Sequence, residues 1–186
     1  PDQSFRKQLE KKLRTIGFEV TIKNMGNPNL TTIEALEKID SVVGEAPDLI
    51  ILQLGDADIN RRFAPSDIYG NLEKITKYIK SKNIYVVMMG TKAPASFDKE
   101  YIDEINKYFK RMQVDTISHK AVSVYLDPLA GIAGNQDLTL GDNLHPNARG
   151  IELIVNTIYP LVDAGLRWRL QVINEWRKKK RREYKF

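Results

Sequence analysis

The sequence predicts an α/β fold in which helices cover both faces of a mainly parallel sheet. Two runs, 48–54 and 84–89, are almost continuously apolar, which is typical of parallel strands buried on both faces. Segments with helical spacing of apolar residues alternate with these runs along the chain. In such sheets, functional sites form beyond the carboxyl ends of the strands.

The first helix is predicted over 4–16, because Phe5, Leu9, Leu13 and Ile16 recur at helical spacing before Gly17. Residues 18–22 alternate between apolar and polar, so they are expected to form a strand. The remaining patterns predict helices over 32–43, 66–81, 98–112 and 148–164, strands over 48–54, 84–89 and 121–126, and helix caps at Thr31 or Thr32 and at Ser66 or Asp67.

Composition indicates one domain with a sizeable core, since the chain has 186 residues and 42% hydrophobic content. No run of eighteen apolar residues suggests a transmembrane segment, and the absence of cysteine excludes disulfides and thiolate metal sites. Asp56 and Asp58 could hold a cation or cap turns, and capping is favoured. No metal and no cofactor are expected. Because the sequence opens at Pro1, a removed or further N-terminal segment is expected.

The positive charge is concentrated at the C-terminus. From 166 to 186 there are nine basic and two acidic residues, a balance of +7, so the first 165 residues carry about −2 of the total of +5. We therefore divide the chain into a globular domain, 1–165, and a basic extension, 166–186, that contains both tryptophans and is expected to be helical.

The segment 141–147, Gly-Asp-Asn-Leu-His-Pro-Asn, carries the main chemical signal. It places Asp142 three residues before His145, one of only two histidines. A carboxylate this close can hold an imidazole in one tautomer, as a general base serving a hydroxyl nucleophile requires. The alternative is a loop histidine beside a capping carboxylate.

Four segments, in the same order as in the family, carry a resemblance to SGNH (GDSL-type) hydrolases, and within them to the bacterial arylesterase, thioesterase I and lysophospholipase L1 group. These segments are 2–5, 24–32, 54–58 and 141–147, with supporting fragments at 92–94 and 129–131. The resemblance covers most of the chain up to about Gly165. It implies a three-layer α/β/α sandwich with a flavodoxin-like sheet and a Ser-His-Asp esterase site.

Residue by residue, the resemblance makes Asp142 and His145 the acid and the base. The family's oxyanion hole uses a backbone N–H from a glycine in the second block and an asparagine side chain in the third. Asn29 and Ala57 stand at these two positions. Alanine has no side-chain donor, and the asparagine follows Pro28, so both positions are degenerate.

The Gly-Asp-Ser block that carries the family's nucleophile does not occur in the chain. Other hydroxyls, those of Thr31, Thr32, Ser66, Ser96, Ser118 and Ser123, are not in a strand-to-helix elbow. In the family, the strand before that block lies at the centre of the sheet, between the strands near Phe18 and Leu49. We therefore expect this slot to be filled by an N-terminal segment or by another polypeptide.

The C-terminal extension is expected to bind a partner. Its candidate residues are Trp168, Trp176, Arg177, Lys178, Lys179, Lys180, Arg181 and Arg182. Other protein subunits are the favoured partners, with RNA, another acidic surface or an anionic membrane as alternatives to a simply solvated tail.

The sequence as a whole predicts an inactive SGNH-type domain retained as a structural or accessory subunit of a larger assembly. An organellar or ribonucleoprotein assembly in the mitochondrial matrix is the favoured setting, and the bacterial periplasm or cytoplasm is the alternative. The competing hypothesis is a serine esterase, thioesterase or lysophospholipase whose nucleophile lies on a further segment or a partner chain. A third is a nucleic-acid-binding module.

Overall fold

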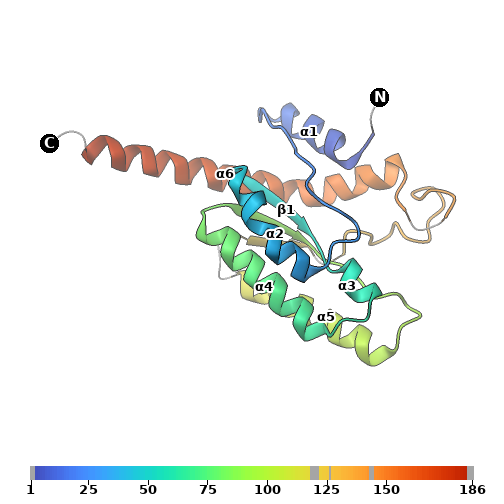
Figure 1. The fold of residues 1–186 in the computed structure, drawn as a ribbon. Helices are drawn as coiled ribbons and strands as arrows, with labels where there is room; N and C mark the ends of the chain where they lie inside the picture. Colours follow the sequence, from blue (N-terminus) through green and yellow to red (C-terminus); the bar gives the residue numbers. More distant parts are fainter. Residues whose placement is uncertain (1–2, 118–121, 126, 143–144, 184–186) are drawn as a thin grey trace.

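The computed structural model describes residues 3–117, 122–125, 127–142 and 145–183. A parallel sheet of three strands occupies the middle layer (Figure 1). In chain order the elements are α1 (Phe5–Thr15), α2 (Thr32–Gly44), β1 (Leu49–Gln53), α3 (Asp56–Asn60), α4 (Pro65–Ser81), β2 (Tyr85–Met89), α5 (Lys99–Ile117), β3 (Val122–Tyr125) and α6 (Ala148–Glu183).

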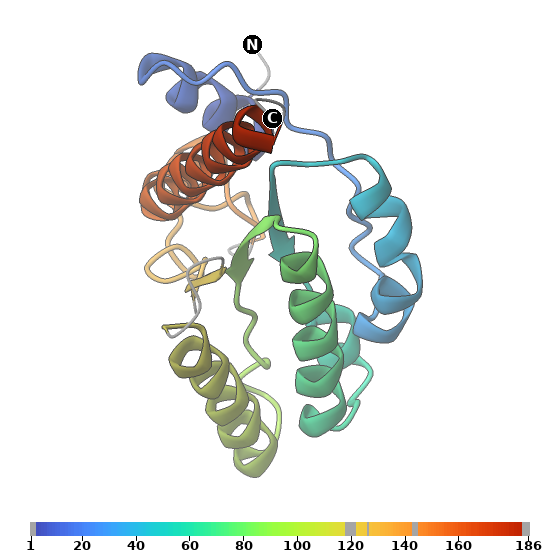
Figure 2. The same cartoon turned by 90° about the vertical axis from the view of Figure 1, so that its left-hand side faces the viewer.

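Helices cover both faces of this sheet, as expected. Figure 2 shows α1 and α6 on one side of the strands and α2, α4 and α5 on the other. Alternate residues of β2 separate the two cores: Val86 and Met88 pack with α2, α4 and α5, whereas Val87 and Met89 pack with α1 and α6. The three-layer α/β/α architecture is therefore confirmed.

The helix α6 approaches the sheet closely because it has a glycine at the contact. A Cβ at Gly165 would lie 2.4 Å from the ring of Tyr85 and 2.7 Å from Leu49. Only a residue without a side chain allows this approach. The helix continues without interruption through 165 and 166, so the extension is the direct continuation of a core helix.

The strand expected at 18–22 is absent from the sheet, which corrects the sequence prediction. The backbone N–H of Ile22 donates to Oε1 of Glu10 at 2.9 Å instead of to a neighbouring strand. Phe18, Val20 and Ile22 still bury apolar surface against the core formed with α1 and α6. The alternation of apolar and polar residues therefore indicates an extended segment with one buried face. It does not show that the backbone is hydrogen-bonded to a neighbouring strand, which is what defines a β-strand.

Two helix starts also differ from the prediction. Residues 56–60, for which the sequence predicts no helix, form the short helix α3. The helix α4 begins at Pro65 after Ala64, so neither Ser66 nor Asp67 is its cap, and the proline supplies the fixed φ of a first helical position. At α2, where two caps were open, Thr31 is the N-cap and forms a capping box with Glu34.

In the part of the chain that the structure describes, β1 pairs with β2 and has no other ladder. The other edge of β1 is therefore unpaired among the described residues, and it is at this edge that we expect the further central strand.

Candidate active site

The loops that follow the three parallel strands lie at one edge of the sheet and are tied together there. Lys92, after β2, forms an ion pair with Asp127, after β3. The hydroxyl of Thr91 donates to the carboxylate of Asp56, which follows β1. Although Asp56 as a residue is exposed, partial withdrawal of its carboxylate from water raises its pKa. These links make the carboxyl edge one continuous surface.

The loop before α6 is held by Asn147. Its Nδ2 donates to the carbonyl oxygens of Asp137 and Thr139, both at 3.0 Å, while its Oδ1 accepts the N–H groups of Arg149 and Gly150 at 2.9 and 3.1 Å. One side chain thus closes the loop and caps the first turn of α6.

Asp142 and His145 form a dyad on this loop. Oδ2 of Asp142 lies 2.5 Å from Nδ1 of His145, and Oδ1 accepts the backbone N–H of His145 at 2.9 Å. A carboxylate partner favours a proton on Nδ1, which leaves Nε2 as the acceptor. The histidine side chain is 70% exposed and that of the aspartate 46%. The pair therefore has the orientation of an acid–base dyad but faces solvent.

The position of Ala57 lies in a buried junction between α2 and α3. Ala57 and its neighbour Asp58 are both buried, and the carboxylate of Asp58 accepts from Thr32 twice. The backbone N–H of Thr32 lies 2.9 Å from Oδ2, and its hydroxyl lies 2.6 Å from Oδ1. Asn71 donates to the same hydroxyl at 3.1 Å. Asp58 is therefore a structural residue that anchors the start of α2.

Asn29 has no backbone donor to spare. Its N–H donates to Oδ1 of Asn27 at 3.0 Å, and its carbonyl oxygen accepts from Nη2 of Arg61 at 3.3 Å. Arg61 is the residue after α3, so this contact joins the segments that carry Asn29 and Ala57. The resemblance assigns the oxyanion to these two positions: Ala57 has no side-chain donor, and the backbone N–H of Asn29 is engaged by Asn27.

Two of the six hydroxyls considered as replacement nucleophiles are engaged within the fold. Thr31 bonds Glu34 at 2.8 Å, and Thr32 bonds Asp58. Ser118 and the side chain of Ser123 lie outside the described residues, as does His119.

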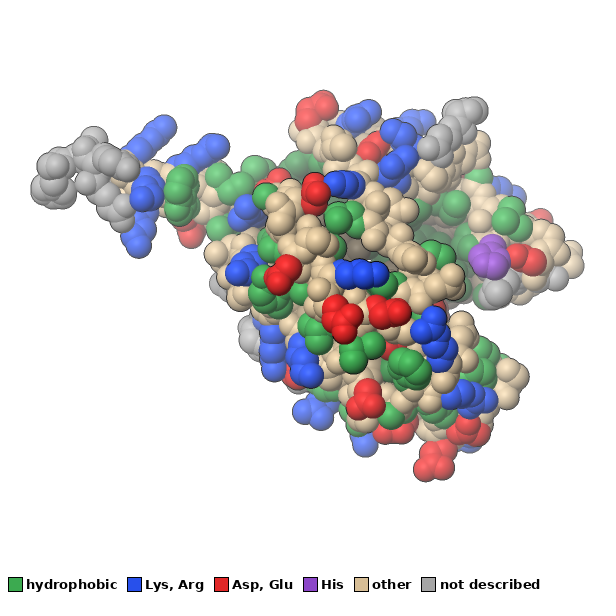
Figure 3. All heavy atoms as spheres, in the orientation of Figure 1, with side chains coloured by type: hydrophobic (Ala, Val, Ile, Leu, Met, Phe, Trp, Pro, Cys, Tyr) green, Lys and Arg blue, Asp and Glu red, His purple; other side chains and the backbone are tan. Residues whose placement is uncertain are grey.

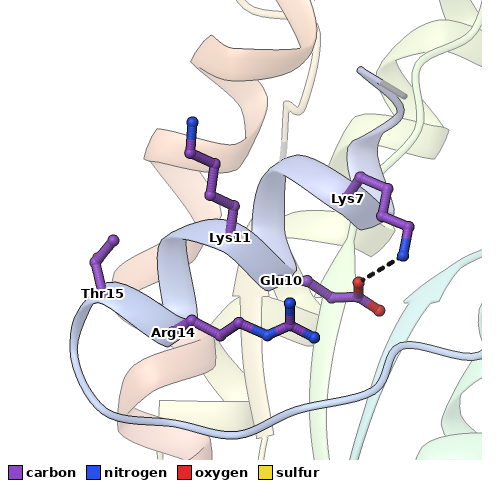
Figure 4. Close-up of a pocket in the computed structure, with 5 residues that line it drawn as sticks. All are labelled: Lys7, Glu10, Lys11, Arg14 and Thr15. Atoms are coloured by element: carbon purple, nitrogen blue, oxygen red, sulfur yellow. Dashed lines mark hydrogen bonds and ion pairs between the residues drawn. The ribbon is translucent and has the colours of Figure 1, made fainter. Parts of the chain in front are cut away.

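A surface hollow on α1 does not include the dyad residues (Figure 4). It has a volume of about 500 Å³ and is lined by Lys7, Glu10, Lys11, Arg14 and Thr15. Glu10 is already engaged by Ile22 and by Lys7, whose Nζ lies 3.2 Å away. The Ile22 N–H and, to a smaller extent, Lys7 lower its pKa. This hollow is the polar face of one helix, and we assign the candidate site to the dyad.

The residues expected to bind a partner lie in two different environments: Trp168 packs against the globular domain, and the others lie on the projecting end of α6. Trp168 packs against Tyr85, with ring centroids 5.7 Å apart, and is partly buried in the core. By contrast, Trp176 is 61% exposed and residues 177–181 are all exposed. The side chain of Arg182 lies outside the described residues.

The fold and the Asp–His dyad define the class of protein. Residues 1–153 match the model of the GDSL-like lipase/acylhydrolase family. The chain therefore belongs to this family.

Individual relatives agree with this assignment. The chain is 22% identical to the esterase TesA of Pseudomonas aeruginosa over 82% of this chain and 74% of that protein. It is 27% identical to an arylesterase of Vibrio mimicus over 78% and 71%. Among solved structures, it resembles TesA with a TM-score of 0.77 at 20% identity, covering 88% of this chain and 89% of that one. It also resembles AlinE4, an SGNH-hydrolase family esterase, with a TM-score of 0.66 at 28% identity, over 88% and 86%.

Sequence reasoning identified the dyad but missed the side chains that hold its loop and the neighbouring segments in place. Asn147 could have been found, because an asparagine directly before a predicted helix is a preferred cap. Thr91 and Glu10 carry no comparable local signal, since their partners lie 35 and 12 residues away.

Proposed function

We propose that this chain is a catalytically silent member of the GDSL family that serves as a structural or accessory subunit of a larger assembly. The observation that carries the proposal is the missing side-chain donor at Ala57 together with the engaged backbone N–H at Asn29, the two positions that the resemblance assigns to the oxyanion hole. Ala57 offers none from its side chain, and the Asn29 N–H is engaged by Asn27. Loss of a single oxyanion donor typically lowers turnover by about 10² to 10³.

The presence of Asp142 and His145 does not by itself require catalysis. Oδ1 of Asp142 accepts the backbone N–H of His145 and so stabilises the turn that leads into α6. Asp58 likewise has a structural role in capping α2. The carboxylates of Asp142 and Asp58 therefore each have a role in the fold, small at the exposed Asp142 and larger at the buried Asp58.

The proposal is tested by assaying the full chain with p-nitrophenyl acetate and with an acyl-CoA, beside its His145→Ala variant. We expect both proteins to hydrolyse each substrate at the rate of buffer. Turnover by the wild type that is lost in His145→Ala would contradict the proposal, because only a working base depends on that imidazole.

A second candidate function, serine ester or thioester hydrolysis, is favoured by the dyad geometry. An imidazole with Nδ1 held 2.5 Å from a carboxylate is oriented to accept a proton at Nε2. The nucleophile would then arrive on a strand added to the second edge of β1, from a further segment of this chain or from a partner.

Labelling of the native complex with a fluorophosphonate distinguishes the two functions. An adduct on a serine that forms in wild-type cells and fails to form with His145→Ala supports the hydrolase. Absence of labelling in both supports the silent subunit.

The accessory role also predicts the size of the native particle. We expect the endogenous protein, in an organellar matrix extract, to migrate well above its own 21.3 kDa. Migration as a monomer would argue against a subunit role.

A further inference from the structure

The C-terminal end of α6 is anchored to the body up to Arg169 and then leaves it. Nε of Arg169 lies 3.0 Å from Oδ1 of Asp48, and its Nη1 donates to the carbonyl of Asn83 at 3.1 Å. Arg167 is paired with Asp163 at 3.0 Å on the same helix. Beyond Arg169, Leu170 is 50% exposed and Val172 and Ile173 are half-buried, and all of the residues 174–181 are exposed, with Trp176 at 61%. Figure 1 shows this end of α6 extending beyond the rest of the molecule.

The projecting end carries positive charge on all sides. Residues 177–181 are five consecutive basic side chains, all exposed and all helical. At 3.6 residues per turn, five consecutive positions complete a full circle around the helix axis. Figure 3 shows blue side chains above and below this end of the helix. We call residues 177–181 the basic collar.

Because the positive charges surround the helix, some classes of partner fit the basic collar better than others. A helix that lies in a membrane interface has an apolar face opposite its basic face, and the basic collar contains no apolar residue. A flat acidic protein surface would meet one side of the helix and leave the other cations unpaired. The walls of a nucleic acid groove present phosphates on both sides of an inserted helix.

The geometry points to binding of the phosphate backbone of a nucleic acid by the basic collar, with the helix end placed between phosphate-lined walls and Trp176 at the entrance. A helix with side chains is about 10 to 12 Å across, which matches the width of about 12 Å of a duplex DNA major groove. The exposed indole can stack on an unpaired base where the strand is open. This binding function is independent of the dyad and of its catalytic state.

Salt dependence provides the quantitative test. If all five cations of the basic collar contact phosphates, the slope of log affinity against log salt is about −4.5 for duplex DNA and about −3.5 for a single strand. The full chain is titrated by fluorescence anisotropy against labelled DNA duplex, RNA duplex and single-stranded RNA of mixed sequence. A slope shallower than about −2 on all three would overturn the proposal.

Matched charge variants locate the binding surface. The double variant Lys178→Gln and Arg181→Gln removes two charges from the basic collar and should reduce the slope by about two. The control, Lys11→Gln and Arg14→Gln, removes two exposed charges from α1 and should leave the slope unchanged. Equal loss in both variants would overturn the assignment to the basic collar, and circular dichroism checks that both remain folded.

Binding to lipid vesicles tests the alternative that the basic collar binds an anionic membrane. Vesicles of phosphatidylcholine with about one third phosphatidylserine present anionic headgroups without a groove. We expect weaker binding to these vesicles than to the best nucleic acid at the same salt. Vesicle binding that the basic collar variant abolishes, without measurable binding to any nucleic acid, would overturn the proposal.

Discussion

The dyad loop and the α2–α3 junction lie at the same edge of the sheet but use their polar groups in opposite ways. In the dyad loop, His145 is 70% exposed and one ring nitrogen is left facing water. In the junction, Asp58 is completely buried and its carboxylate is engaged by Thr32. The first region is an exposed pair with the geometry of an acid–base dyad, whereas the second is part of the core.

Under the proposed function, this contrast explains how the family fold persists in a catalytically silent member. An exposed pair can be kept or lost with little effect on folding, because water replaces its bonds. A buried carboxylate cannot be lost without leaving its donors unsatisfied. Substitutions in the two regions should therefore have very different effects on stability.

The largest expected effect comes from Asp58→Ala. Removal of this carboxylate leaves the N–H and hydroxyl of Thr32 without their acceptor in a buried site, so we expect a loss of about 3 kcal/mol of unfolding free energy. Urea denaturation measures it. Asp142→Ala is the control from the exposed region, expected at about 0.5 kcal/mol. Equal losses of unfolding free energy in the two variants would contradict the claim that the buried junction contributes more to stability than the exposed dyad.

A smaller loss of unfolding free energy is expected from Gly150→Ala, in which the added methyl group would clash with residues of the dyad loop. A Cβ at this position would lie 2.2 Å from the carbonyl oxygen of Leu138 and 3.0 Å from Cβ of Pro146. The loop must then move, at a cost of about 1 to 3 kcal/mol, and the NMR signals of His145 should shift.

Gly70→Ala is the matched control for this substitution. Gly70 is also helical, and a Cβ there meets nothing within 4 Å. Alanine should therefore stabilise α4 by up to about 1 kcal/mol through helix propensity. A loss of stability at Gly70 similar to that at Gly150 would show that the clash with the loop is not the cause.

The comparison also shows what local sequence patterns can and cannot predict. Apolar periodicity over residues 5–16 correctly predicted α1, because the spacing of Leu9 and Leu13 alone defines the buried face. The same kind of evidence at 18–22 failed. One buried face is visible in the alternation of Phe18, Val20 and Ile22, but the presence of a hydrogen-bonding partner for the backbone is decided by distant residues.

The site follows the same logic. Asp142 and His145 could be paired from sequence because their contact spans three residues within one loop. The bonds of Thr32 to Asp58 span 26 residues, and those of Thr91 to Asp56 span 35. Composition and spacing do not encode such long-range partners, so only the coordinates distinguish a structural carboxylate from a reactive one.

The pH dependence of stability offers a further test at Glu10, which lies on the opposite face of the sheet from the α2–α3 junction. The Ile22 N–H, followed by Lys7, holds the pKa of Glu10 below its ordinary value of 4.5. Because the folded pKa is lowered, Glu10 contributes stability above pH 4.5, and this contribution is lost as the pH falls below that value toward the folded pKa.

Substitution of Glu10 should therefore make the unfolding free energy less dependent on pH in the acid range. We expect Glu10→Gln to be less stable than the wild type at pH 7, with a difference that shrinks below pH 4.5. Unfolding midpoints in urea between pH 3 and 7 measure this. Glu37→Gln, at an exposed position of α2, should follow the wild-type curve throughout. A difference for Glu10→Gln that grows at low pH would contradict the role of the Ile22 bond.

The smallest effect on stability, and the most specific to the dyad, is expected from Asp142→Asn. We expect a change in unfolding free energy within about 0.5 kcal/mol, because both side chains are largely exposed. The tautomer of His145 should respond instead. In the wild type, ¹⁵N NMR of the neutral imidazole should place the proton on Nδ1, where the Asp142 carboxylate accepts it. In Asp142→Asn this preference should be lost, since an amide can donate to the ring as well as accept from it. An unchanged tautomer in the variant would mean that the carboxylate does not orient the ring, and the dyad would then lack even the geometric basis of a general base.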